Sequence, residues 1–293
     1  MPFLGRRRLP APLAAVLAAA VVAPAALLAA PAAHADPPTN AGAIFKWGYA
    51  AWKDEFLTSR PRPEWTINKS SLVSNKHGML NIESRRGGRG GTITALASDQ
   101  AAKYGRWEAR VRAHRYTYRG TPYTAVWELV PVNKYRCGAK SIVLSSYAPD
   151  DARATGAVRT GPANEFSYGL DLDLTNDVFH TYAIEVTTDH VSWFVDTEVV
   201  HTERRPEALS GVKFQPRFRL QAVKGATMDH SRMQMDWARY YTLDRPNQKS
   251  IEAPAMEQGT YAGTCAKRGT TVTDPAPPAE PSVRVAERWR YQR

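Results

Sequence analysis

Two acidic residues have the spacing by which a β-strand can present a pair of catalytic carboxyl groups. Asp171 and Asp173 lie two positions apart within residues 170–174, so in a strand their side chains share one face. Two carboxyl groups about 5–5.5 Å apart can hydrolyse a glycosidic bond, one as nucleophile and the other as acid and base. Such a pair more commonly forms a solvent-exposed strand face or contacts a cation. Both interpretations stay open.

A third acidic residue, Glu128, interrupts an apolar strand pattern at residues 125–130. A lone carboxylate in such a strand either faces the solvent or binds a sugar hydroxyl, and we expect it to face the solvent. With Asp171 or Asp173 it would form a displaced catalytic pair only if their carboxyl oxygens faced each other across a groove. These three residues are the fallback catalytic candidates.

Aromatic side chains near Glu128 are candidates for binding a glycan, because tyrosine and tryptophan combine an apolar ring with a polar group. Tyr123 and Trp127 lie in the expected strand that holds Glu128, and Tyr147 lies at the end of the next one. We therefore take these three as candidate glycan-binding residues. Other aromatic residues lie in strands that define the fold, and we expect them in the core: Trp107, Trp193, Phe194 and Trp237.

Short segments in which apolar and polar residues alternate run through most of the chain. In residues 104–113 small or apolar side chains alternate with arginine and glutamate, so one face should pack and the other should contact water. Residues 148–162 have the composition of a polar loop. This pattern predicts an all-β fold of two packed sheets. The expected strands are residues 65–67, 79–82, 91–96, 104–113, 123–132, 140–146, 170–174, 179–186, 191–195, 199–201, 218–222 and 233–241.

The first 35 residues resemble a secretory signal peptide, because three arginines precede an apolar run that ends in small residues. A membrane anchor is the alternative, but Pro24 interrupts this run of weakly apolar alanines. The sequence thus predicts an extracellular protein, exported by the Sec or the Tat route. The expected parts are a signal peptide at 1–35, a flexible leader at 36–50, a folded domain at 51–268 and a disordered Pro-rich tail at 269–293.

The chain is basic. Its formal net charge of +11 at pH 7 falls by 3 to +8 when the arginines at residues 6–8 leave with the signal peptide. Such a charge favours anionic partners such as acidic glycans and cell-wall polymers. Nucleic acid is not expected as a partner, because the charges are dispersed and no groove-reading motif occurs. After cleavage no apolar stretch is long enough to span a membrane, and we expect a monomer that needs no cofactor or metal.

The chain has two cysteines, Cys137 and Cys265. An even number of cysteines in an exported protein favours one disulfide. The bond would stabilise the fold by roughly 4–5 kcal/mol according to the chain-entropy description, because it closes a long loop. A metal site is the weaker interpretation, since no Cys-x-x-Cys motif or histidine cluster accompanies the cysteines.

Four segments, in this order, resemble the family 16 glycoside hydrolases, which include laminarinases and lichenases. Residues 52–65 hold Trp-Lys-Asp-Glu-Phe followed by Trp, and residues 104–110 hold Tyr-Gly-Arg-Trp-Glu-Ala-Arg. Residues 179–196 hold Phe-His-Thr-Tyr-Ala-Ile-Glu and then Trp-Phe-Val-Asp, and residues 236–240 hold Asp-Trp-Ala-Arg-Tyr. The resemblance covers residues 52–243. It implies a jelly-roll sandwich of the concanavalin A-like lectin and glucanase type, and a polysaccharide as ligand.

The catalytic motif of that family, Glu-x-Asp-x-(x)-Glu on one strand, has no counterpart here. The resemblance places it within residues 138–147, and no acidic residue occurs in residues 129–149. The three catalytic positions are taken by Ser141, Val143 and Ser145. A bulge in this strand would bring Ser146 into the third position. The pKa of a serine hydroxyl is far too high for the acid, and a serine nucleophile needs an adjacent base.

The leading hypothesis is therefore a secreted, catalytically degenerate relative that binds a polysaccharide such as a β-glucan. The first alternative is an active glycosidase or transglycosylase that uses displaced carboxylates. The second is a non-catalytic cell-surface protein that binds protein or anionic wall polymer through its basic face. A groove lined by Tyr123 and Trp127 would favour glycan binding, and a filled groove would favour the second alternative.

Overall fold

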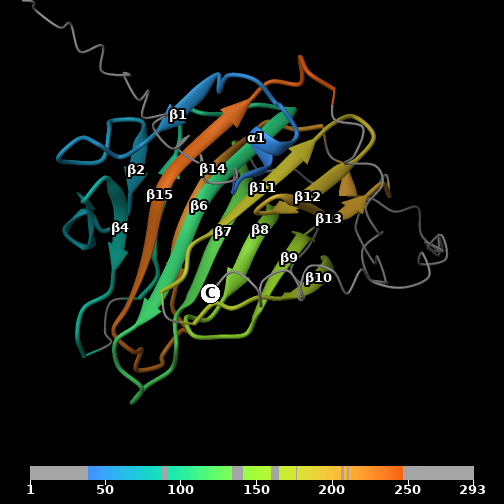
Figure 1. Cartoon of the computed structure of the whole chain (residues 1–293). Coiled ribbons are helices and arrows are strands. Elements are labelled where there is room, and N and C mark those ends of the chain that lie inside the picture. The colour runs from blue at the N-terminus through green and yellow to red at the C-terminus, as the bar shows by residue number, and fades with distance from the viewer. Residues whose placement is uncertain are drawn as a thin grey trace, which may run out of the picture. The chain divides into compact units, whose positions relative to one another are not determined.

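The computed structural model describes residues 39–87, 91–133, 141–159, 165–175, 177–205, 208–209 and 211–246. They belong to the second of two compact units of the chain, residues 38–293. In this unit two antiparallel sheets pack face to face, and the helical elements α1 (Ala41–Ile44) and η1 (Ser70–Leu72) are short (Figure 1). The predicted all-β jelly-roll sandwich is confirmed.

The eight-stranded sheet has the order β13-β12-β11-β6-β15-β4-β3, and β1 also pairs with β15. Neighbouring strands pair antiparallel, and residues that are paired in register point to the same face of the sheet. Its strands are β1 (Trp52–Asp54), β3 (Val73–Lys76), β4 (Met79–Glu83), β6 (Gly105–Arg115), β11 (His180–Val186), β12 (Val191–Val195), β13 (Glu198–Glu203) and β15 (Ser231–Tyr241).

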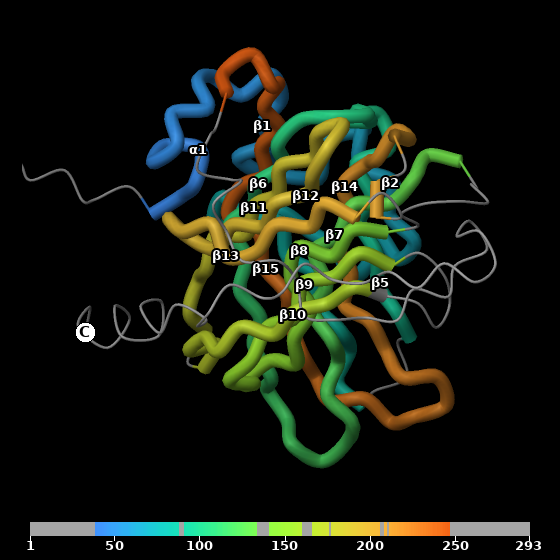
Figure 2. Tube along the Cα trace, turned by 90° about the vertical axis from the view of Figure 1, so that its right-hand side faces the viewer, coloured from blue at the N-terminus to red at the C-terminus, as the bar shows by residue number. Residues whose placement is uncertain are grey.

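The seven-stranded sheet has the order β10-β9-β8-β7-β14-β5-β2. Figure 2 shows β10, β9, β8 and β7 side by side in this order. This sheet holds most of the residues that the sequence marks as candidate site residues. Its strands are β2 (Trp65–Ile67), β5 (Ile93–Ala97), β7 (Thr124–Pro131), β8 (Ser141–Tyr147), β9 (Arg153–Arg159), β10 (Glu165–Asp171) and β14 (Phe214–Gln221).

Aromatic and aliphatic side chains fill the space between the sheets. Trp127 on β7 stacks on Phe218 of β14, with ring centroids 4.3 Å apart, and its indole nitrogen donates to the carbonyl of Tyr182 on the opposite sheet. Of the four aromatic residues expected in the core, Trp107 and Trp193 lie in this core as predicted. Phe194 and Trp237 are also at most 8% exposed, but Phe194 is buried in a separate cluster with Trp47. Because burial of such surface drives folding, it fixes which face of each strand points inwards.

The prediction of a polar loop at residues 148–162 is wrong in part, because residues 153–159 form the strand β9. Its inward residues Ala154 and Val158 join the core, but its small residues give little strand signal. The next strand, β10, ends at Asp171, and Asp173 lies beyond it. The two aspartates therefore do not share a strand, contrary to the prediction.

The flexible leader predicted at residues 36–50 is also wrong in part, because the segment from Asn40 to Trp47 is packed on the domain. The Asn40 side chain caps α1 by accepting a hydrogen bond from the N–H of Ala43 at 2.9 Å. Trp47 is 3% exposed and packs edge-on against Phe194 and Tyr241 of the eight-stranded sheet. The prediction failed because the preceding Pro-rich residues dominated the composition.

This N-terminal segment covers part of the face of β6 that was predicted to be exposed to solvent. Arg106 and Glu108 are 1% and 0% exposed. The guanidinium of Arg106 lies 5.3 Å from the ring centroid of Trp47, and Glu108 accepts a hydrogen bond from the N–H of Gly42 at 3.0 Å. The alternation along β6 is as predicted, but the exposed part of its polar face begins only at Arg110, whose side chain is 38% exposed.

Several predictions concern residues outside the described part of the chain. These are the signal peptide at 1–35, the tail at 269–293, and the disulfide between Cys137 and Cys265. No helix in the described part is long and apolar enough to cross a membrane. Export, the disulfide and the disordered tail stay predictions.

Candidate functional site

The candidate site is the outer face of the seven-stranded sheet, the face that points away from the core. On β7 the side chains of Trp127 and Leu129 point into the core. Because side chains alternate along a strand, Val126 and Glu128 point to the outer face. The strand expected to carry the family's catalytic motif, β8, pairs directly with β7. The outer face of these two strands is therefore where the family chemistry would take place.

A β-bulge decides which residues of β8 reach this face. Glu128 pairs with Val143, and Trp127 pairs with Ser145, so that Leu144 is the extra residue. The outer positions of β8 are therefore Ser141, Val143 and Ser146. The bulged register considered from the sequence is the observed one, and the assignment of Ser145 to this face is wrong. Ser145 is 1% exposed and lies opposite the inward-pointing Trp127.

Glu128 does not face the solvent as predicted, because arginines on β14 hold its carboxylate. It is 0% exposed. Arg217, its direct register partner, donates to Oε1 from Nε at 2.9 Å and from a terminal nitrogen at 2.7 Å. The Nε of Arg219 lies 2.6 Å from the same oxygen. Two guanidinium groups thus bind one carboxylate through charge-assisted contacts.

Both a carboxylate and other guanidinium groups influence Arg219. Burial lowers the pKa of its guanidinium; Glu128 raises it, while Arg217 and Arg159 lower it further. Arg159 comes from β9, where it pairs with Ser141. The guanidinium group of Arg219 is therefore influenced by two other arginines, one on its own strand and one on β9, as well as by Glu128.

A small apolar cluster lies in the middle of the same face. It consists of Val126 on β7, Val143 on β8 and Ala157 on β9, which are at most 1% exposed. Val143 and Ala157 are register partners. The valine that takes the middle position of the expected motif is therefore packed among apolar neighbours and has no atom that could accept a proton.

The two aspartates do not complete a catalytic pair with Glu128. The register runs from Glu128 through Val143 and Ala157 to Ser167 on β10, so three strand spacings of about 4.8 Å, roughly 14 Å in all, separate β7 from β10. Asp171 lies a further four residues along β10 and pairs with the exposed Arg153 at 2.9 Å. A retaining pair needs about 5–5.5 Å, so the displaced pair expected as a fallback is not assembled.

Asp173 makes its contacts in the chain that follows β10. Its carboxylate accepts hydrogen bonds from the N–H and the hydroxyl of Thr175, at 3.2 Å and 2.5 Å. Its carbonyl oxygen contacts Nε2 of His180 at 3.1 Å. These contacts shape the chain between β10 and β11. Asp173 is therefore a turn residue.

The three candidate glycan-binding aromatics do not line the face, and this prediction is wrong. Tyr123, Trp127 and Tyr147 are 0%, 1% and 4% exposed and belong to the core between the sheets. Their positions have the parity of Ala125 and Leu129, which are also core residues. The alternation of residues along the strand already indicated that these side chains point inwards. The prediction gave more weight to their aromatic character than to their place in this alternation.

Sequence reasoning missed the arginines of β14. Arg217 and Arg219 alternate with Phe218 and Leu220, which are 0% exposed. A charge at every second position of a strand whose other residues are apolar indicates a charged outer face. That signal was present in residues 217–220. The pairing with Glu128 on β7 was not, because the sequence does not specify which strands are neighbours.

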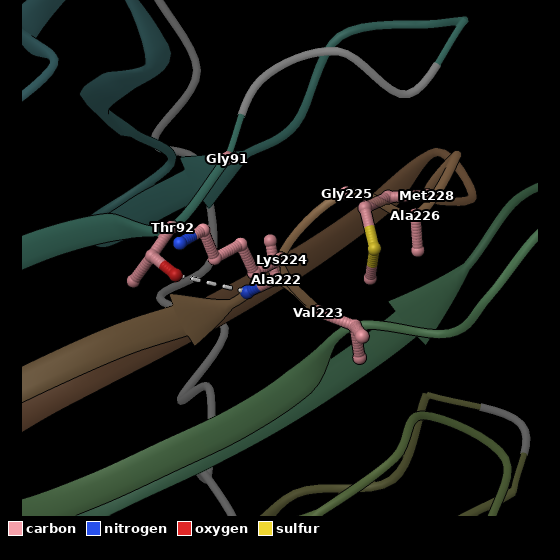
Figure 3. A pocket seen from close by; sticks show the side chains of 8 residues that line it. All are labelled: Gly91, Thr92, Ala222, Val223, Lys224, Gly225, Ala226 and Met228. Carbon is pink, nitrogen blue, oxygen red and sulfur yellow. Dashed lines mark hydrogen bonds between the residues drawn. The ribbon is translucent and has the colours of Figure 1, made fainter.

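A separate open pocket of about 390 Å³ lies where β14 ends and the chain enters β5 (Figure 3). The N–H of Ala222 donates to the hydroxyl of Thr92 across it at 3.0 Å. Lys224 is the charged residue among its described lining: Gly91, Thr92, Ala222, Val223, Lys224, Gly225, Ala226 and Met228. The lining offers no pair of acid and base groups. Among the residues that the structure describes, no group of three or more His, Cys, Asp or Glu could hold a metal ion.

Comparison of the sequence with known families gives one match. Residues 154–244 match the model of the glycosyl hydrolases family 16. The matched segment begins after β8, so it does not include the strand where the catalytic motif was expected. No curated protein matches the chain in sequence.

Solved structures of family 16 enzymes share the fold. The laminarinase from Rhodothermus marinus superposes with a TM-score of 0.54 at 19% identity, over 66% of this chain and 96% of that one. The laminarinase catalytic domain from Thermotoga maritima gives 0.55 at 18% identity, over 68% and 99%. A family 16 endo-glucanase from Bacteroides ovatus gives 0.53 at 15% identity, over 64% and 99%. The chain is therefore similar in sequence to the glycosyl hydrolases of family 16 over residues 154–244, and its sandwich has the same fold as these solved structures.

Proposed function

We propose that the protein is an exported polysaccharide-binding protein that has the family 16 fold and lacks the hydrolytic carboxylate pair. One observation carries this proposal. The outer positions of β8 are Ser141, Val143 and Ser146, and the carboxylate of the neighbouring strand, Glu128, is bound by two arginines. A β-glucan or a related glycan is the class of ligand that the resemblance implies.

The chemistry of these side chains does not support glycoside hydrolysis. Hydrolysis needs one carboxyl group to protonate the leaving oxygen and a second to attack the sugar or activate water. A serine hydroxyl cannot protonate the leaving group, and Val143 has no polar atom. Glu128 accepts hydrogen bonds from Arg217 and is fully buried, so its carboxylate oxygens are engaged and are not accessible to a sugar. Binding remains possible, because it needs only the shape and donors of the face.

Proteins with the same fold give precedents for glycan binding, and one of them binds with a glutamate replaced. An endo-β-1,3(4)-glucanase of family 16 was co-crystallised with a glucan oligosaccharide at its active site, as a mutant with serine in place of a glutamate. A Bacteroides ovatus family 16 protein was crystallised in complex with an oligosaccharide product. Serine at such a position is thus compatible with an occupied glycan site in the first of these proteins, and we extend this to the present chain.

The test combines binding and cleavage on the same polymers. The purified chain is incubated with β-glucans, galactans and anionic wall polymers, and each mixture is assayed for co-sedimentation and for new reducing ends. An active family 16 laminarinase serves as the positive control for cleavage. We expect the chain to sediment with at least one polymer and to release no reducing ends.

Other outcomes would support the alternatives. Reducing ends that disappear in Glu128→Gln or Asp171→Asn would show that the protein is a glycosidase with displaced acids and would overturn the proposal. The absence of binding to every polymer would also overturn it and would favour a cell-surface protein that binds another protein.

A further inference from the structure

We infer that a neutral polysaccharide contacts the protein at one end of the sandwich, through the exposed rings of Tyr116 and Tyr118. This inference rests on the proposed function and adds a binding site away from the outer face of the seven-stranded sheet. It follows from three properties of this end: the exposure of the two rings, the order of the loop that carries them, and the pairing of the charges beside them.

The two tyrosines lie in the loop of residues 116–123, which joins β6 to β7. This loop runs beside the loop of residues 222–230, between β14 and β15, because Thr121 and Met228 form a β-bridge. Both loops project from the same end of the sandwich, at the bottom of Figure 1. Met228 also lines the open pocket of about 390 Å³. The tyrosine loop and the pocket therefore adjoin.

The rings are exposed although they are largely apolar. Tyr118 is 63% exposed and Tyr116 is 39% exposed. Val223, which lines the pocket, is 53% exposed. Exposed apolar groups gathered in one place mark binding sites. A tyrosine ring offers an apolar face to the C–H groups of a sugar while its hydroxyl keeps a hydrogen-bond partner, so a glycan suits this end.

A buried carboxylate orders the loop that carries the tyrosines. Asp229 is 2% exposed. It accepts hydrogen bonds from the hydroxyl of Thr117 at 3.0 Å and from the N–H groups of Arg119 and Gly120 at 2.9 Å. A terminal nitrogen of Arg115 donates to its other oxygen at 2.6 Å. A loop that is ordered in this way loses little conformational entropy when a ligand binds.

Neighbouring side chains orient both rings. The guanidinium of Arg115 lies 4.5 Å from the ring centroid of Tyr118, whose hydroxyl donates to the carboxylate of Asp150 at 2.5 Å. Tyr116 stacks on the ring of His230, with the centroids 4.5 Å apart. Each ring thus has a protein group on one face, and its exposed remainder can contact a sugar.

The arginines that touch these rings are paired with acidic residues, which favours a neutral ligand. Arg115 pairs with Asp229 at 2.6 Å. Arg232 lies 5.5 Å from the ring centroid of Tyr116 and pairs with Asp177 at 2.5 Å. Because both guanidinium groups already have an anionic partner, contact with the rings, rather than attraction of negative charge, determines which polymer binds here.

The first experiment compares the wild type with two truncations of the rings. The purified full chain is titrated with laminarin, mixed-linkage β-glucan, galactan and the anionic polygalacturonate by isothermal titration calorimetry. We expect at least one neutral polymer to bind. Tyr118→Ala should weaken its binding about fivefold to tenfold, because an aromatic contact contributes about that much. Tyr116→Ala should weaken binding less, since its ring is less exposed.

Two further variants are controls. Tyr49 is 98% exposed and precedes β1, whose partner Tyr240 pairs with Trp107 near the opposite end of β6. Tyr49→Ala therefore removes an exposed ring away from the proposed site and should leave binding unchanged. Tyr118→Phe removes the hydroxyl that binds Asp150 but keeps the ring, so it should retain most of the affinity. Unfolding curves of all variants show whether the fold is retained.

A second measurement detects the contact in the wild-type protein. Tetranitromethane nitrates exposed tyrosines, and mass spectrometry of peptides locates the modified residues. The bound neutral polymer should reduce nitration of Tyr118 and leave nitration of Tyr49 unchanged.

Each result decides the inference. Weaker binding in Tyr118→Ala, with affinity retained in Tyr118→Phe and Tyr49→Ala and with Tyr118 protected from nitration, supports it. Binding of a neutral polymer that neither Tyr116→Ala nor Tyr118→Ala weakens would overturn it and leave the proposed polysaccharide binding intact. Equal losses in Tyr118→Ala and Tyr49→Ala, or binding of polygalacturonate alone, would also overturn it. No binding to any polymer would overturn both this inference and the proposed function.

Discussion

Two of the glutamates that the structure describes are completely buried, one on each sheet, and their surroundings differ. Both Glu108 and Glu128 are 0% exposed. Glu128 on β7 is held by two cations, with nitrogen atoms of Arg217 and Arg219 at 2.7 Å and 2.6 Å. The cost of burying its charge is offset by opposite charge and by hydrogen bonds.

Glu108 on β6 has mostly neutral partners. It accepts hydrogen bonds from the N–H of Gly42 at 3.0 Å and from the hydroxyl of Tyr241 at 3.3 Å. Burial raises its pKa to about 7, although the hydrogen bond from Gly42, the charge of Arg239 and the hydroxyl of Tyr241 lower it. Equal burial therefore gives one glutamate that is paired with two guanidinium groups, and one whose pKa is raised to about 7.

The outer faces of the two sheets have different surroundings. On the eight-stranded sheet the chain covers its own face: the segment from Asn40 to Trp47 packs over Glu108. On the seven-stranded sheet an excess of arginine surrounds Glu128. A shifted pKa alone would mark Glu108 as the more reactive group. Its donors, however, come from the N-terminal segment and from Tyr241, which is buried against that segment, and this indicates a structural role.

The largest expected effect concerns the charge pairing of Glu128. Changing both Arg217 and Arg219 to methionine removes its two cations and leaves a buried carboxylate without a partner. We expect the free energy of unfolding to fall by about 3–5 kcal/mol, because an uncompensated buried charge is costly. Urea denaturation followed by tryptophan fluorescence measures this change.

A triple variant provides the control. When Glu128→Leu is added to the two methionine substitutions, the buried charge is gone and most of the lost stability should return. Exposed ion pairs contribute little, so Arg110→Met should lower stability by less than about 1 kcal/mol. A double variant as stable as the wild type would show that Glu128 does not depend on these arginines.

Most of the architecture could be predicted from the sequence because alternation is a local property. The strands at residues 104–113, 179–186 and 191–195 appear as β6, β11 and β12. Two elements could not be predicted this way. β9 is built from small residues that pack well only beside its neighbours, and the segment from Asn40 to Trp47 is ordered by contacts with a distant sheet.

The candidate site was predicted less well, since it depends on strand neighbours. The absence of acids on β8 follows from the sequence, and the bulge that brings Ser146 to the outer face was considered there as one of two registers. Arg217 and Glu128 are 89 residues apart in sequence, and nothing local indicates that they meet. Tyr123 and Trp127 were predicted to bind glycan because they are aromatic. They lie an even number of residues from Leu129, so their side chains share its inward face.

The second prediction concerns the proton of Glu108. Its pKa in the folded protein, about 7, is higher than the ordinary value of 4.5, so the folded state binds more protons than the unfolded state between these values. This contribution to stability is complete below about pH 4.5 and is lost as the pH rises through 7. We expect it to amount to about 3 kcal/mol across this window, from the size of the pKa difference.

Glu108→Gln is the variant that isolates this effect. The amide oxygen can still accept the hydrogen bond from Gly42, and the side chain no longer titrates. The free energy of unfolding, measured by urea denaturation between pH 5 and pH 8, should therefore decrease less with rising pH in the variant than in the wild type. Parallel pH profiles would show that Glu108 is ionised without cost and would remove the contrast with Glu128.

The smallest expected effect tests whether the N-terminal segment provides the surroundings of Glu108. A Cβ atom at Gly42 would lie 2.7 Å from the hydroxyl oxygen of Tyr241 and 2.9 Å from a carboxylate oxygen of Glu108. Gly42→Ala should therefore push the segment away from β6 and lower stability by about 1–3 kcal/mol, the usual cost of overpacking. Ala43→Ser, at an exposed neighbouring position, is the control and should change stability by less than about 0.5 kcal/mol.

Hydrogen exchange distinguishes displacement of the segment from general destabilisation. In Gly42→Ala the N–H groups of Phe45 and Trp47, which donate to the carbonyls of Ala41 and Gly42, should lose protection while those of β7 and β14 keep theirs. Water that reaches Glu108 would then lower its pKa toward the ordinary value and weaken the pH dependence predicted above. If protection fell equally in both sheets, the segment would be an integral part of the fold, and the burial of Glu108 could not be separated from that of Glu128.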